Sequence, residues 1–523
     1  MAVTTNMMNN VVNRTVPLTI LPVAAMRESD ARTISEGTPG RELMLRAGKA
    51  VFEQADWKPP VAILCGSGNN AGDGYVIAKL LHDAGTACEV IMLSDRCSED
   101  GAYYLALCQE AGVKVTPWAP GRTLEGFGTV VDCLFGTGFR GTVKDSAAEA
   151  IDRINESGAY VVSVDINSGL NGDSGLAEKC VRSDLTVSVG SFQPGHFLGM
   201  AKDVMKEKVN CDIGIRPVDE HITLVTEADI APFFRPRKNN AHKGTYGYTA
   251  LIGGSRKYSG AVRLAAMANS AMRAGAGVVK LAVPDLLWPA VAPAVLESTV
   301  FPLKDDGDGI AFDEGQFAEL TGNVRTAAFG MGIGAGEGAA RALCWLLEHF
   351  SGTLIVDADG LNLLSRLDRE QVRGAACKMI LTPHVKEFSR LTGLGVGEIL
   401  TAPAASAEAY AKETGAVVLL KGPSTVVTDG ERTRIVDAGC AGMATAGSGD
   451  VLSGILSAAA GYIPDRLEAA AAAAWINGKA GEKAQALYGS VAMTAGDTAA
   501  CVRDVVCALE KRNEKDRPSV PEA

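Results

Sequence analysis

The sequence predicts an α/β protein with two domains. Its 523 residues exceed the length of one typical domain, and 47% hydrophobic residues can fill large cores. In both halves, short apolar runs precede glycine-rich turns and helical patterns. A proline-containing, partly basic stretch at 216–243 lacks periodicity, which is typical of a domain boundary. We expect an N-terminal extension at 1–20, a first domain at 21–220, a second domain at 221–510 and a polar tail at 511–523.

The composition argues against two classes of partner. The net charge is -11 and no basic stripe is present, so a nucleic-acid backbone is not an expected ligand. The first residues are polar and unlike a signal peptide, and no apolar run is long enough to span a membrane. The 12 cysteines are scattered without a Cys-x-x-Cys pair, which indicates reduced thiols and neither a zinc site nor a disulfide framework. We therefore expect a cytoplasmic protein that binds neither nucleic acid nor membrane.

The first domain is expected to open with a pair of helices within residues 29–54. Ser29 or Asp30 can cap the first helix, and Thr38-Pro39-Gly40 interrupts the pattern. Apolar residues then recur at helical spacing.

A strand, a glycine-rich turn and a helix follow at 61–84. This unit holds phosphates in doubly wound folds, where ligands bind at the carboxyl ends of the strands. Here the turn also carries Asn69, Asn70 and Asp73. These oxygen-bearing side chains stand where a plain phosphate loop would offer backbone alone.

Two later strands deliver further oxygen atoms to the same edge. The run at 128–133 contains Asp132 and leads into a glycine-rich loop at 136–142, while the run at 160–164 leads directly into Asp165. Carboxylate, amide and hydroxyl oxygens without histidine or cysteine suit a hard cation rather than zinc. Alternatively, these residues only shape turns. Further strands are expected at 185–189 and 208–213.

The second half repeats the α/β pattern. A strand at 247–252, a helix at about 260–274 and a strand at 278–283 form one strand–helix–strand unit.

One stretch of the second half favours a different function. A strand at 326–329 leads into Gly330-Met331-Gly332-Ile333-Gly334, a helix follows to Phe350, and a strand at 353–356 ends at Asp357. Glycines followed by an acid about twenty residues on resemble the dinucleotide fingerprint of oxidoreductases. The pattern lies in mid-domain, however, and no later segment supplies a partner for hydride transfer. A dehydrogenase is thus one alternative.

The most informative stretch is Gly442–Asp450, which opens a small-residue apolar helix. A glycine-rich turn at a helix N-terminus offers unpaired N–H groups and the positive end of the helix dipole to a phosphate. Asp450 beside that phosphate is suited to be a catalytic base in phosphoryl transfer. A second phosphate-type feature at 417–425 strengthens this interpretation over an ordinary helix-terminal aspartate.

Several long motifs together resemble the bifunctional NAD(P)H-hydrate repair enzymes. The stretches at 69–74, 136–142 and 165–169 look like the family's epimerase half. Those at 381–388, 421–425 and 442–450 look like its ribokinase-like dehydratase half. The resemblance covers about residues 21–508 with both halves in the family's order. It implies a Rossmann-like three-layer α/β/α domain followed by a ribokinase-like α/β domain.

The resemblance assigns roles in the first domain residue by residue. It implies that Asn70, Asp132 and Ser168 hold a potassium ion and that Asp165 has a catalytic role. The implied ligands of the hydrated dinucleotide are Asn69, Asn70, Ala71, Gly72, Asp73, Gly136, Thr137, Gly138, Phe139, Arg140, Gly141, Thr142 and Asp165.

The second domain receives its roles in the same way. The resemblance implies that Asp450 is the catalytic residue and lines the hydrate site with Ala261, Gly332 and His384. Alone, His384 would more often be structural, but the motif around it favours a ligand. The implied adenine-nucleotide ligands are Lys421, Gly422, Pro423, Ser424, Thr425 and Gly449.

The resemblance therefore implies repair of NADH hydrate and NADPH hydrate. The first domain would epimerise the R and S forms, and the second would dehydrate the S form with ADP. ATP is the alternative donor, because no residue visibly excludes a third phosphate. Mg²⁺ is the expected companion of the nucleotide, and a homo-oligomer is the expected assembly. The alternatives are a ribokinase-like small-molecule kinase with a fused nucleotide-binding domain, and a nucleotide-binding regulatory protein whose first domain is inactive.

Overall fold

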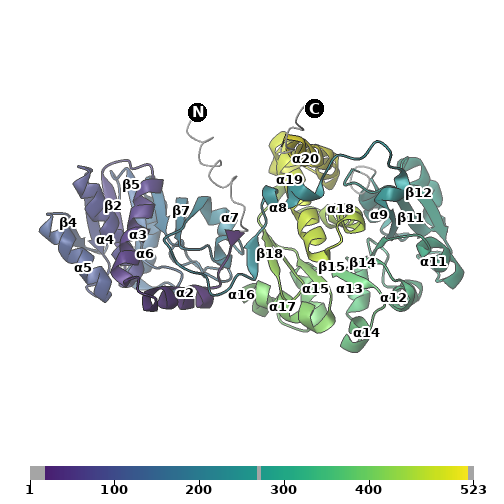
Figure 1. Ribbon diagram of the computed structural model, residues 1–523, viewed down its shortest axis with the longest axis horizontal. Coiled ribbons are helices and arrows are strands. Elements are labelled where there is room, and N and C mark those ends of the chain that lie inside the picture. The colour runs from purple at the N-terminus through teal and green to yellow at the C-terminus, as the bar shows by residue number, and fades with distance from the viewer. Residues whose placement is uncertain (1–17, 268–272, 516–523) are drawn as a thin grey trace, which may run out of the picture. The chain divides into compact units, whose positions relative to one another are not determined.

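The computed structural model describes residues 18–267 and 273–515 (Figure 1). One compact unit spans Thr19–Ile222, and the other comprises the described chain from Thr223 onward. Each unit has its own sheet with flanking helices. The predicted fold class, two α/β domains, is confirmed.

The sheet of the unit Thr19–Ile222 is parallel throughout and has the strand order β4-β3-β2-β5-β6-β7-β8. Its central strands are buried on both faces, as expected for apolar runs covered by helices. The strands are β2 (Val61–Cys65), β3 (Cys88–Met92), β4 (Lys114–Pro117), β5 (Thr129–Cys133), β6 (Tyr160–Val164), β7 (Ser183–Val189) and β8 (Met205–Cys211). The strand expected at 208–213 thus begins and ends earlier.

The α-helices of this unit are α2 (Val23–Ser35), α3 (Gly40–Gln54), α4 (Asn69–Asp83), α5 (Glu99–Glu110), α6 (Asp145–Glu156) and α7 (Ala201–Val204). Helix α4 begins at Asn69, so the residues expected in a loop at 69–74 form its first turns. The glycines explain this difference. A methyl group on Gly72 would meet the Met44 sulfur of α3, and one on Gly74 would meet the Cys133 sulfur at 2.9 Å. They let α4 pack closely on its neighbours rather than forming an open turn.

The sheet of the second unit has the order β9-β18-β17-β16-β15-β14-β13-β10-β11-β12. In this order, all neighbouring strands from β16 to β12 pair in parallel, whereas β17 pairs antiparallel with both β16 and β18. The strands are β9 (Ile222–Leu224), β10 (Tyr248–Ile252), β11 (Val278–Pro284), β12 (Thr299–Leu303), β13 (Thr326–Phe329), β14 (Thr353–Val356), β15 (Lys378–Leu381), β16 (Val417–Leu420), β17 (Thr425–Thr428) and β18 (Thr433–Val436); the described chain itself opens with the short strand β1 (Leu18–Thr19).

The α-helices of the second unit are α8 (Glu227–Ile230), α9 (Ser259–Ala266), α10 (Trp288–Val291), α11 (Glu314–Thr321), α12 (Glu337–His349), α13 (Asp359–Leu364), α14 (Arg369–Arg373), α15 (Val385–Thr392), α16 (Val396–Thr401), α17 (Pro403–Thr414), α18 (Ser448–Tyr462), α19 (Arg466–Ala492) and α20 (Ala495–Lys515). The helix expected at 260–274 corresponds to α9, and part of the expected span, 268–272, lies outside the described residues.

Helix α18 lies in the core of the second unit. It packs on α19, α9 and strands β10, β13 and β14, beside α19 in Figure 1. Its residues from Val451 to Ala459 are buried, which explains why the sequence is apolar and small on every side. Its first turn therefore lies in a fixed place relative to the sheet. Among the helices that the structure describes, none combines the length and hydropathy needed to cross a membrane.

Candidate functional sites

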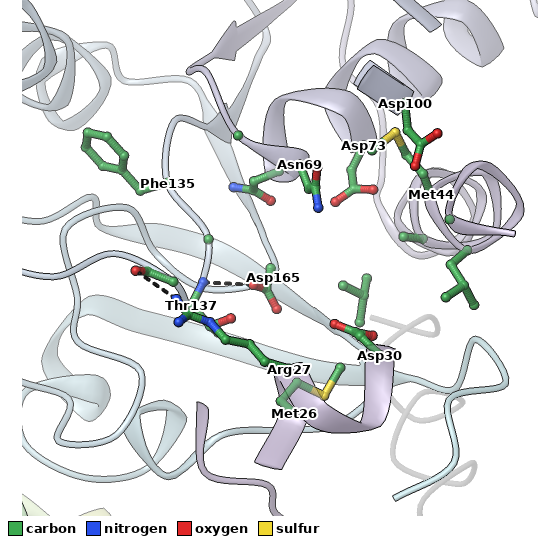
Figure 2. A pocket seen from close by; sticks show the side chains of 18 of the residues that line it. Met26, Arg27, Asp30, Met44, Asn69, Asp73, Asp100, Phe135, Thr137 and Asp165 are labelled. Atoms are coloured by element: carbon green, nitrogen blue, oxygen red, sulfur yellow. Dashed lines mark hydrogen bonds between the residues drawn. The ribbon is translucent and has the colours of Figure 1, made fainter. Parts of the chain in front are cut away.

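A cavity of about 540 Å³ opens at the carboxyl ends of β2, β5 and β6, the ligand-binding edge of a doubly wound sheet. Helices α2 and α3 contribute to its wall, with Met26 and Asp30 from α2 and Met44 from α3 (Figure 2). Eight of the residues predicted to bind substrate line it: Asn69, Asn70, Asp73, Gly136, Thr137, Gly138, Phe139 and Asp165.

Five other predicted ligands lie outside this lining. Ala71 and Gly72 are buried inside α4, where they pack the helix against its neighbours. Arg140, Gly141 and Thr142 are exposed on the loop after β5, and Arg140 approaches Asp173 at 3.8 Å. These loop residues reach substrate only if the substrate extends beyond the pocket.

The amide of Asn70 is the clearest sign that the pocket takes a ligand. The residue is only 8% exposed, yet neither its Oδ1 nor its Nδ2 has a hydrogen-bond partner. An unpaired buried amide costs roughly 1–3 kcal/mol, so native sites retain one chiefly where a ligand, ion or water completes it. Gly136 lies against it, because a methyl group there would stand 3.5 Å from the Asn70 Cβ and 2.9 Å from the Asp165 carboxylate.

Asp165 is held in a strained backbone conformation at the end of β6. Its φ of 65° is in the left-handed region, which is unfavourable for a residue with a side chain. The Thr137 N–H donates to the Asp165 carboxylate at 2.9 Å. The His196 ring lies on the other side, with Nε2 at 2.7 Å from the Asp165 carbonyl oxygen and Nδ1 accepting from the Gln193 N–H at 3.0 Å.

These contacts fix the state of His196. Because Nδ1 accepts, Nε2 carries the proton and donates to the Asp165 carbonyl. Burial lowers the pKa of His196 to about 4, so the ring is neutral at physiological pH. His196 therefore acts as a neutral clamp on the strained peptide that orients the Asp165 carboxylate.

Asp132 is fully buried, and both its oxygens are hydrogen-bonded. Oδ1 accepts from the Leu134 N–H at 3.3 Å and the Ser168 hydroxyl at 2.5 Å. Oδ2 accepts from the Ser168 N–H at 2.9 Å and the Ser163 hydroxyl at 3.0 Å. Burial raises its pKa, and these donors oppose the shift. Asp132 thus ties the turn after β6 to strand β5.

Three carboxyl groups share the pocket with little cationic compensation. Burial raises the pKa of Asp165 despite the Thr137 N–H. Burial together with the charges of Asp165 and Asp30 raises the pKa of Asp73 well above its usual range. Burial and the Asp165 charge raise the pKa of Asp30 to about 6. Protons are therefore exchangeable in this pocket near neutral pH.

In the second unit, the first turn of α18 offers an anion site. Gly447 precedes the helix at φ 94°, and no side chain caps the helix N-terminus. The first-turn N–H groups are thus not occupied by a cap and remain available to a phosphate. Thr445 and Ala446 on the preceding turn are exposed, so the site is reachable.

Asp450 is the acidic residue of that first turn. Burial and the Asp357 charge raise its pKa to about 7, and Lys421 opposes the shift. A carboxylate with this pKa can both accept and return a proton near neutral pH.

Lys421 joins this site to the sheet. Its Nζ lies 3.0 Å from Asp357 Oδ1 and 4.0 Å from Glu387 Oε2, and the Ser453 hydroxyl of α18 donates to Asp357 Oδ2 at 2.8 Å. Burial alone would lower the pKa of Lys421, but Asp357 and Glu387 outweigh it and raise the value. Gly449 lies beside the pair, because a methyl group there would come within 3.4 Å of Lys421 Nζ.

The other predicted nucleotide ligands form the turn between β16 and β17. Gly422 and Pro423 are exposed, whereas the Ser424 hydroxyl is buried and donates to Asp437 at 2.7 Å. Thr425 begins β17 and pairs with Val436. The structure thus brings Lys421 and Gly449 together, and it leaves Gly422 and Pro423 exposed in the turn between β16 and β17.

His384 caps helix α15. Its Nδ1 accepts from the Lys386 N–H at 3.0 Å, and Glu387 accepts in return from the His384 N–H at 2.8 Å. The side chain is still 49% exposed, and its Nε2 lies 3.5 Å from Glu387 Oε1. Burial lowers its pKa, an effect that the Glu387 charge opposes. His384 therefore has a structural role whether or not it also binds substrate.

Two family models match the chain, one to each unit. The model described as YjeF-related protein N-terminus matches residues 40–195, and the model described as NAD(P)H-hydrate dehydratase matches residues 249–502.

Three relatives that match most of this chain are each named bifunctional NAD(P)H-hydrate repair enzyme Nnr. The relative from Pyrobaculum aerophilum is 34% identical over 87% of this chain and 91% of its own length. The relative from Escherichia coli is 32% identical over 92% of both chains. That from Thermanaerovibrio acidaminovorans is 34% identical over 88% of this chain and 92% of its own. The chain belongs to the family of bifunctional NAD(P)H-hydrate repair enzymes.

Family membership and packing together account for the glycines that suggested a dehydrogenase. A methyl group on Gly330 would overlap the Asp357 carbonyl oxygen, and one on Gly332 would meet the Tyr258 carbonyl oxygen at 2.7 Å. The Gly334 N–H donates to the Asp359 carboxylate at 2.9 Å. The loop is thus engaged with neighbouring loops of the repair enzyme. Ala261 lies beside Gly332, as expected for two residues of one site, with its Cβ 3.1 Å from that added methyl position.

Sequence patterns did not identify several side chains at these sites. Asp30 was considered only as a helix cap, and Arg27, whose guanidinium lies 3.4 Å from the Gly138 carbonyl oxygen, was not considered. In the sequence, Asp357 stands out only as the acid that completes a dinucleotide fingerprint, and the pattern does not predict its pairing with Lys421. No local pattern points to Asp30, because the packing of α2 on the rest of the unit determines which of its side chains reach the pocket.

Proposed function

We propose that this chain repairs NADH and NADPH whose nicotinamide ring has gained water. The unit Thr19–Ile222 interconverts the R and S epimers of the hydrate. The unit from Thr223 onward dehydrates the S epimer at the expense of ADP, giving AMP and phosphate. The name of the relatives and the order of the two matching family models along the chain support this division.

The observation that carries the proposal is the position of Asp450. It stands in the first turn of α18, whose N-terminus no side chain caps, and has a pKa raised to about 7 by burial and the Asp357 charge. An anion-binding helix end next to an exchangeable proton acceptor suits phosphoryl transfer to a hydroxyl group.

The dehydration follows from that arrangement. Asp450 accepts the proton of the hydrate's hydroxyl as its oxygen attacks the terminal phosphorus of ADP. The first-turn N–H groups of α18 stabilise the charge on the transferring phosphoryl group. The phosphorylated oxygen then leaves as phosphate while the neighbouring carbon loses a proton, which restores the ring double bond. Lys421, paired with Asp357, keeps a positive charge beside Gly449.

Mg²⁺ fits this proposal as an ion carried by the nucleotide. Within residues 18–267 and 273–515, no cluster of three or more His, Cys, Asp or Glu side chains forms a metal cage. Mg²⁺ commonly binds substrate phosphates with one or two carboxylates and keeps several waters, so no such cage is required. When bound, it would neutralise phosphate charge. We propose ADP as the donor, and ATP remains the alternative to test.

Potassium fits the first unit in part. Asn70 offers a buried amide oxygen without a partner, whereas the Ser168 hydroxyl already donates to Asp132 Oδ1 and accepts from the Phe135 N–H. Oxygen donors of this kind suit a hard monovalent cation. Both Asp132 oxygens already accept two hydrogen bonds, so Asp132 contributes mainly negative charge. When bound, the ion would offset the negative charge of the pocket's carboxylates and hold oxygen atoms of the substrate.

Asp165 is the proposed acid–base residue of the epimerase. Its carboxylate lines the cavity and accepts from the Thr137 N–H, and the His196 clamp holds its carbonyl oxygen. The remaining predicted ligands in the lining, such as Asn69 and Phe139, shape the space for the hydrated ring.

A direct assay tests the proposal. The purified protein is incubated with a mixture of R and S hydrates and either ADP or ATP, and the return of reduced-nicotinamide absorbance is followed. We expect complete conversion of the mixture, with AMP formed from ADP. A nucleotide-dependent build-up of a stable phosphorylated vitamin or sugar would instead indicate a small-molecule kinase. Tight hydrate binding without turnover would indicate a regulatory binding protein.

We further propose a homo-oligomer in the cytoplasm, where the reduced cofactors are used. Light scattering on the purified chain measures the assembly, and fractionation of cells locates it.

A further inference from the structure

The pocket of the first unit contains more acidic groups than a single acid–base residue requires. Asp30 from α2, Asp73 from α4 and Asp165 from the end of β6 all line the cavity, and Figure 2 shows them pointing into it from three elements. An acidic cluster is not a site by itself. Here it shares the cavity with the unpartnered, 92% buried amide of Asn70, which independently indicates a ligand.

We propose that Asp30 is a second catalytic acid–base residue of the epimerase and acts with Asp165 on opposite faces of the hydrated ring. This proposal rests on the proposed epimerase function. The two epimers differ in the face of the ring that carries the hydroxyl group. One fixed carboxyl group serves only one face, so inversion without turning the substrate over needs a second group from another wall.

Asp30 is suited to that role by its surroundings. The charged side chains that line the same cavity are Arg27, Asp73, Asp100 and Asp165. Arg27 is directed at the Gly138 carbonyl oxygen, 3.4 Å away, and Asp100 pairs with Arg41 at 3.1 Å. Asp30 thus faces two carboxyl groups without a cation of its own, and its raised pKa of about 6, caused by burial and then by Asp165, lets it hold or release a proton near neutral pH.

Asp73 is less suited than Asp30 to be the second acid–base residue. It is only 8% exposed and lies in the first turns of α4. Burial and the charges of Asp165 and Asp30 raise the pKa of Asp73 well above its usual range, which disfavours its carboxylate form.

The reaction balances without another reactant. The hydroxyl-bearing carbon lies beside the ring nitrogen, whose lone pair forms a C=N bond as the C–O bond breaks. One carboxyl group gives its proton to the leaving hydroxyl, which becomes water. Water then adds to the opposite face, its electrons form the new C–O bond, and its proton passes to the other carboxylate. One proton has moved between the two residues, and exchange with solvent or the reverse reaction restores it.

The test uses the full chain without nucleotide, so that the dehydratase is idle. Pure R hydrate is supplied, and the S epimer is measured by chromatography for the parent, Asp30→Asn, Asp30→Glu and the control Glu28→Gln. Glu28 is an exposed carboxylate on the same helix and is outside the cavity lining. We expect kcat to fall about 100-fold or more in Asp30→Asn with KM little changed, partial recovery in Asp30→Glu, and parental activity in Glu28→Gln.

Two further readouts separate catalysis from folding. Dehydration of pure S hydrate should be unchanged in every variant. In ¹⁸O-labelled water, the epimer formed by the parent should carry the label, because the C–O bond breaks. An Asp30→Asn variant within twofold of the parent, or an epimer without label, would overturn the proposal. If the parent itself fails to epimerise, the proposed function fails instead.

Discussion

The two sites of this protein differ in whether their buried carboxyl groups have cationic partners. In the first unit, three carboxyl groups face one cavity with no cation paired to Asp30, Asp73 or Asp165 in the described structure. In the second unit, the buried Asp357 is paired with Lys421, and Asp450 stands beside the N–H groups of a helix terminus. The first arrangement favours moving protons. The second favours binding and stabilising an added anion.

This difference separates the chemistries of the two proposed reactions. Epimerisation changes no net charge, so it needs exchangeable protons on two sides of the ring. Phosphoryl transfer concentrates negative charge, so it needs fixed dipoles and a retained cation. The following predictions test whether the two sites are independent, from the largest expected effect to the smallest.

Replacing Asp450 by Asn should give the largest effect. The amide keeps the shape of the side chain but cannot accept the hydroxyl proton, so turnover of S hydrate should fall by about 100-fold or more. ADP should still bind, because the N–H groups of α18 are unchanged. Calorimetry measures ADP affinity, and single-turnover formation of AMP measures the rate of phosphoryl transfer.

The epimerase of the same variant is the control, and it should keep the parental rate. Near-parental turnover of S hydrate in Asp450→Asn would show that the glycine-rich turn only holds phosphate and that another group takes the proton.

Replacing Asp132 by Ala should impair the first unit alone. The Ser168 N–H and Leu134 N–H would lose their buried acceptor, and the negative charge proposed to help hold potassium would vanish. We expect R-to-S conversion to fall about 10- to 100-fold, as for other groups that orient ion ligands. Rates on each pure epimer decide the outcome. Equal loss of both activities in a folded variant would contradict separate sites.

Potassium dependence sharpens the same test. Replacing potassium by a large organic cation should slow the parental epimerase and leave Asp132→Ala almost unaffected. A parental epimerase indifferent to the cation would argue against the potassium site.

The residues proposed for the second site form a clearer local pattern in the sequence than those proposed for the first, and the reason is physical. The glycine-rich turn before α18 and Asp450 in the first turn of that helix are neighbours in the sequence, so the local pattern alone indicates an acidic residue at a helix start. Asp132 and Asp165 were also visible, because strand ends in a parallel sheet meet at one edge.

The features that the sequence did not predict depend on tertiary packing. Asp30 reaches the pocket only because α2 packs over strand ends more than a hundred residues away in sequence. Lys421 meets Asp357 because they directly follow the carboxyl ends of β16 and β14, the two strands that flank β15 in the sheet. The Lys421 N–H also donates to the Pro383 carbonyl oxygen at 2.9 Å. Helix α4 began earlier than predicted because Gly72 and Gly74 serve close packing rather than a loop.

The rate of dehydration should fall as the pH is lowered, by less than in the variants above. The pKa of Asp450 is raised to about 7 by burial and the Asp357 charge, and the residue must be deprotonated to act as a base. Lowering the pH from 8 to 6 should therefore reduce kcat/KM for S hydrate about tenfold. ADP affinity over the same range and the residual rate of Asp450→Asn are the controls. A pH-independent parental rate would remove Asp450 as the base.

The smallest effect is expected at His196, which lies behind Asp165 and touches no substrate. His196→Leu removes the Nε2–H donor at 2.7 Å from the Asp165 carbonyl oxygen, leaving that buried oxygen unpaired and freeing the strained φ of 65° to relax. We expect the epimerase kcat to fall about fivefold with KM little changed, and the first unit to lose roughly 1–3 kcal/mol of stability. His196→Gln is the matched variant, because its side-chain amide can still donate to that carbonyl and should restore most of the rate. Steady-state epimerisation and denaturant unfolding measure the two effects, with dehydration of S hydrate as the internal control. If Leu and Gln variants epimerise equally fast, the clamp on Asp165 does not position the acid–base group.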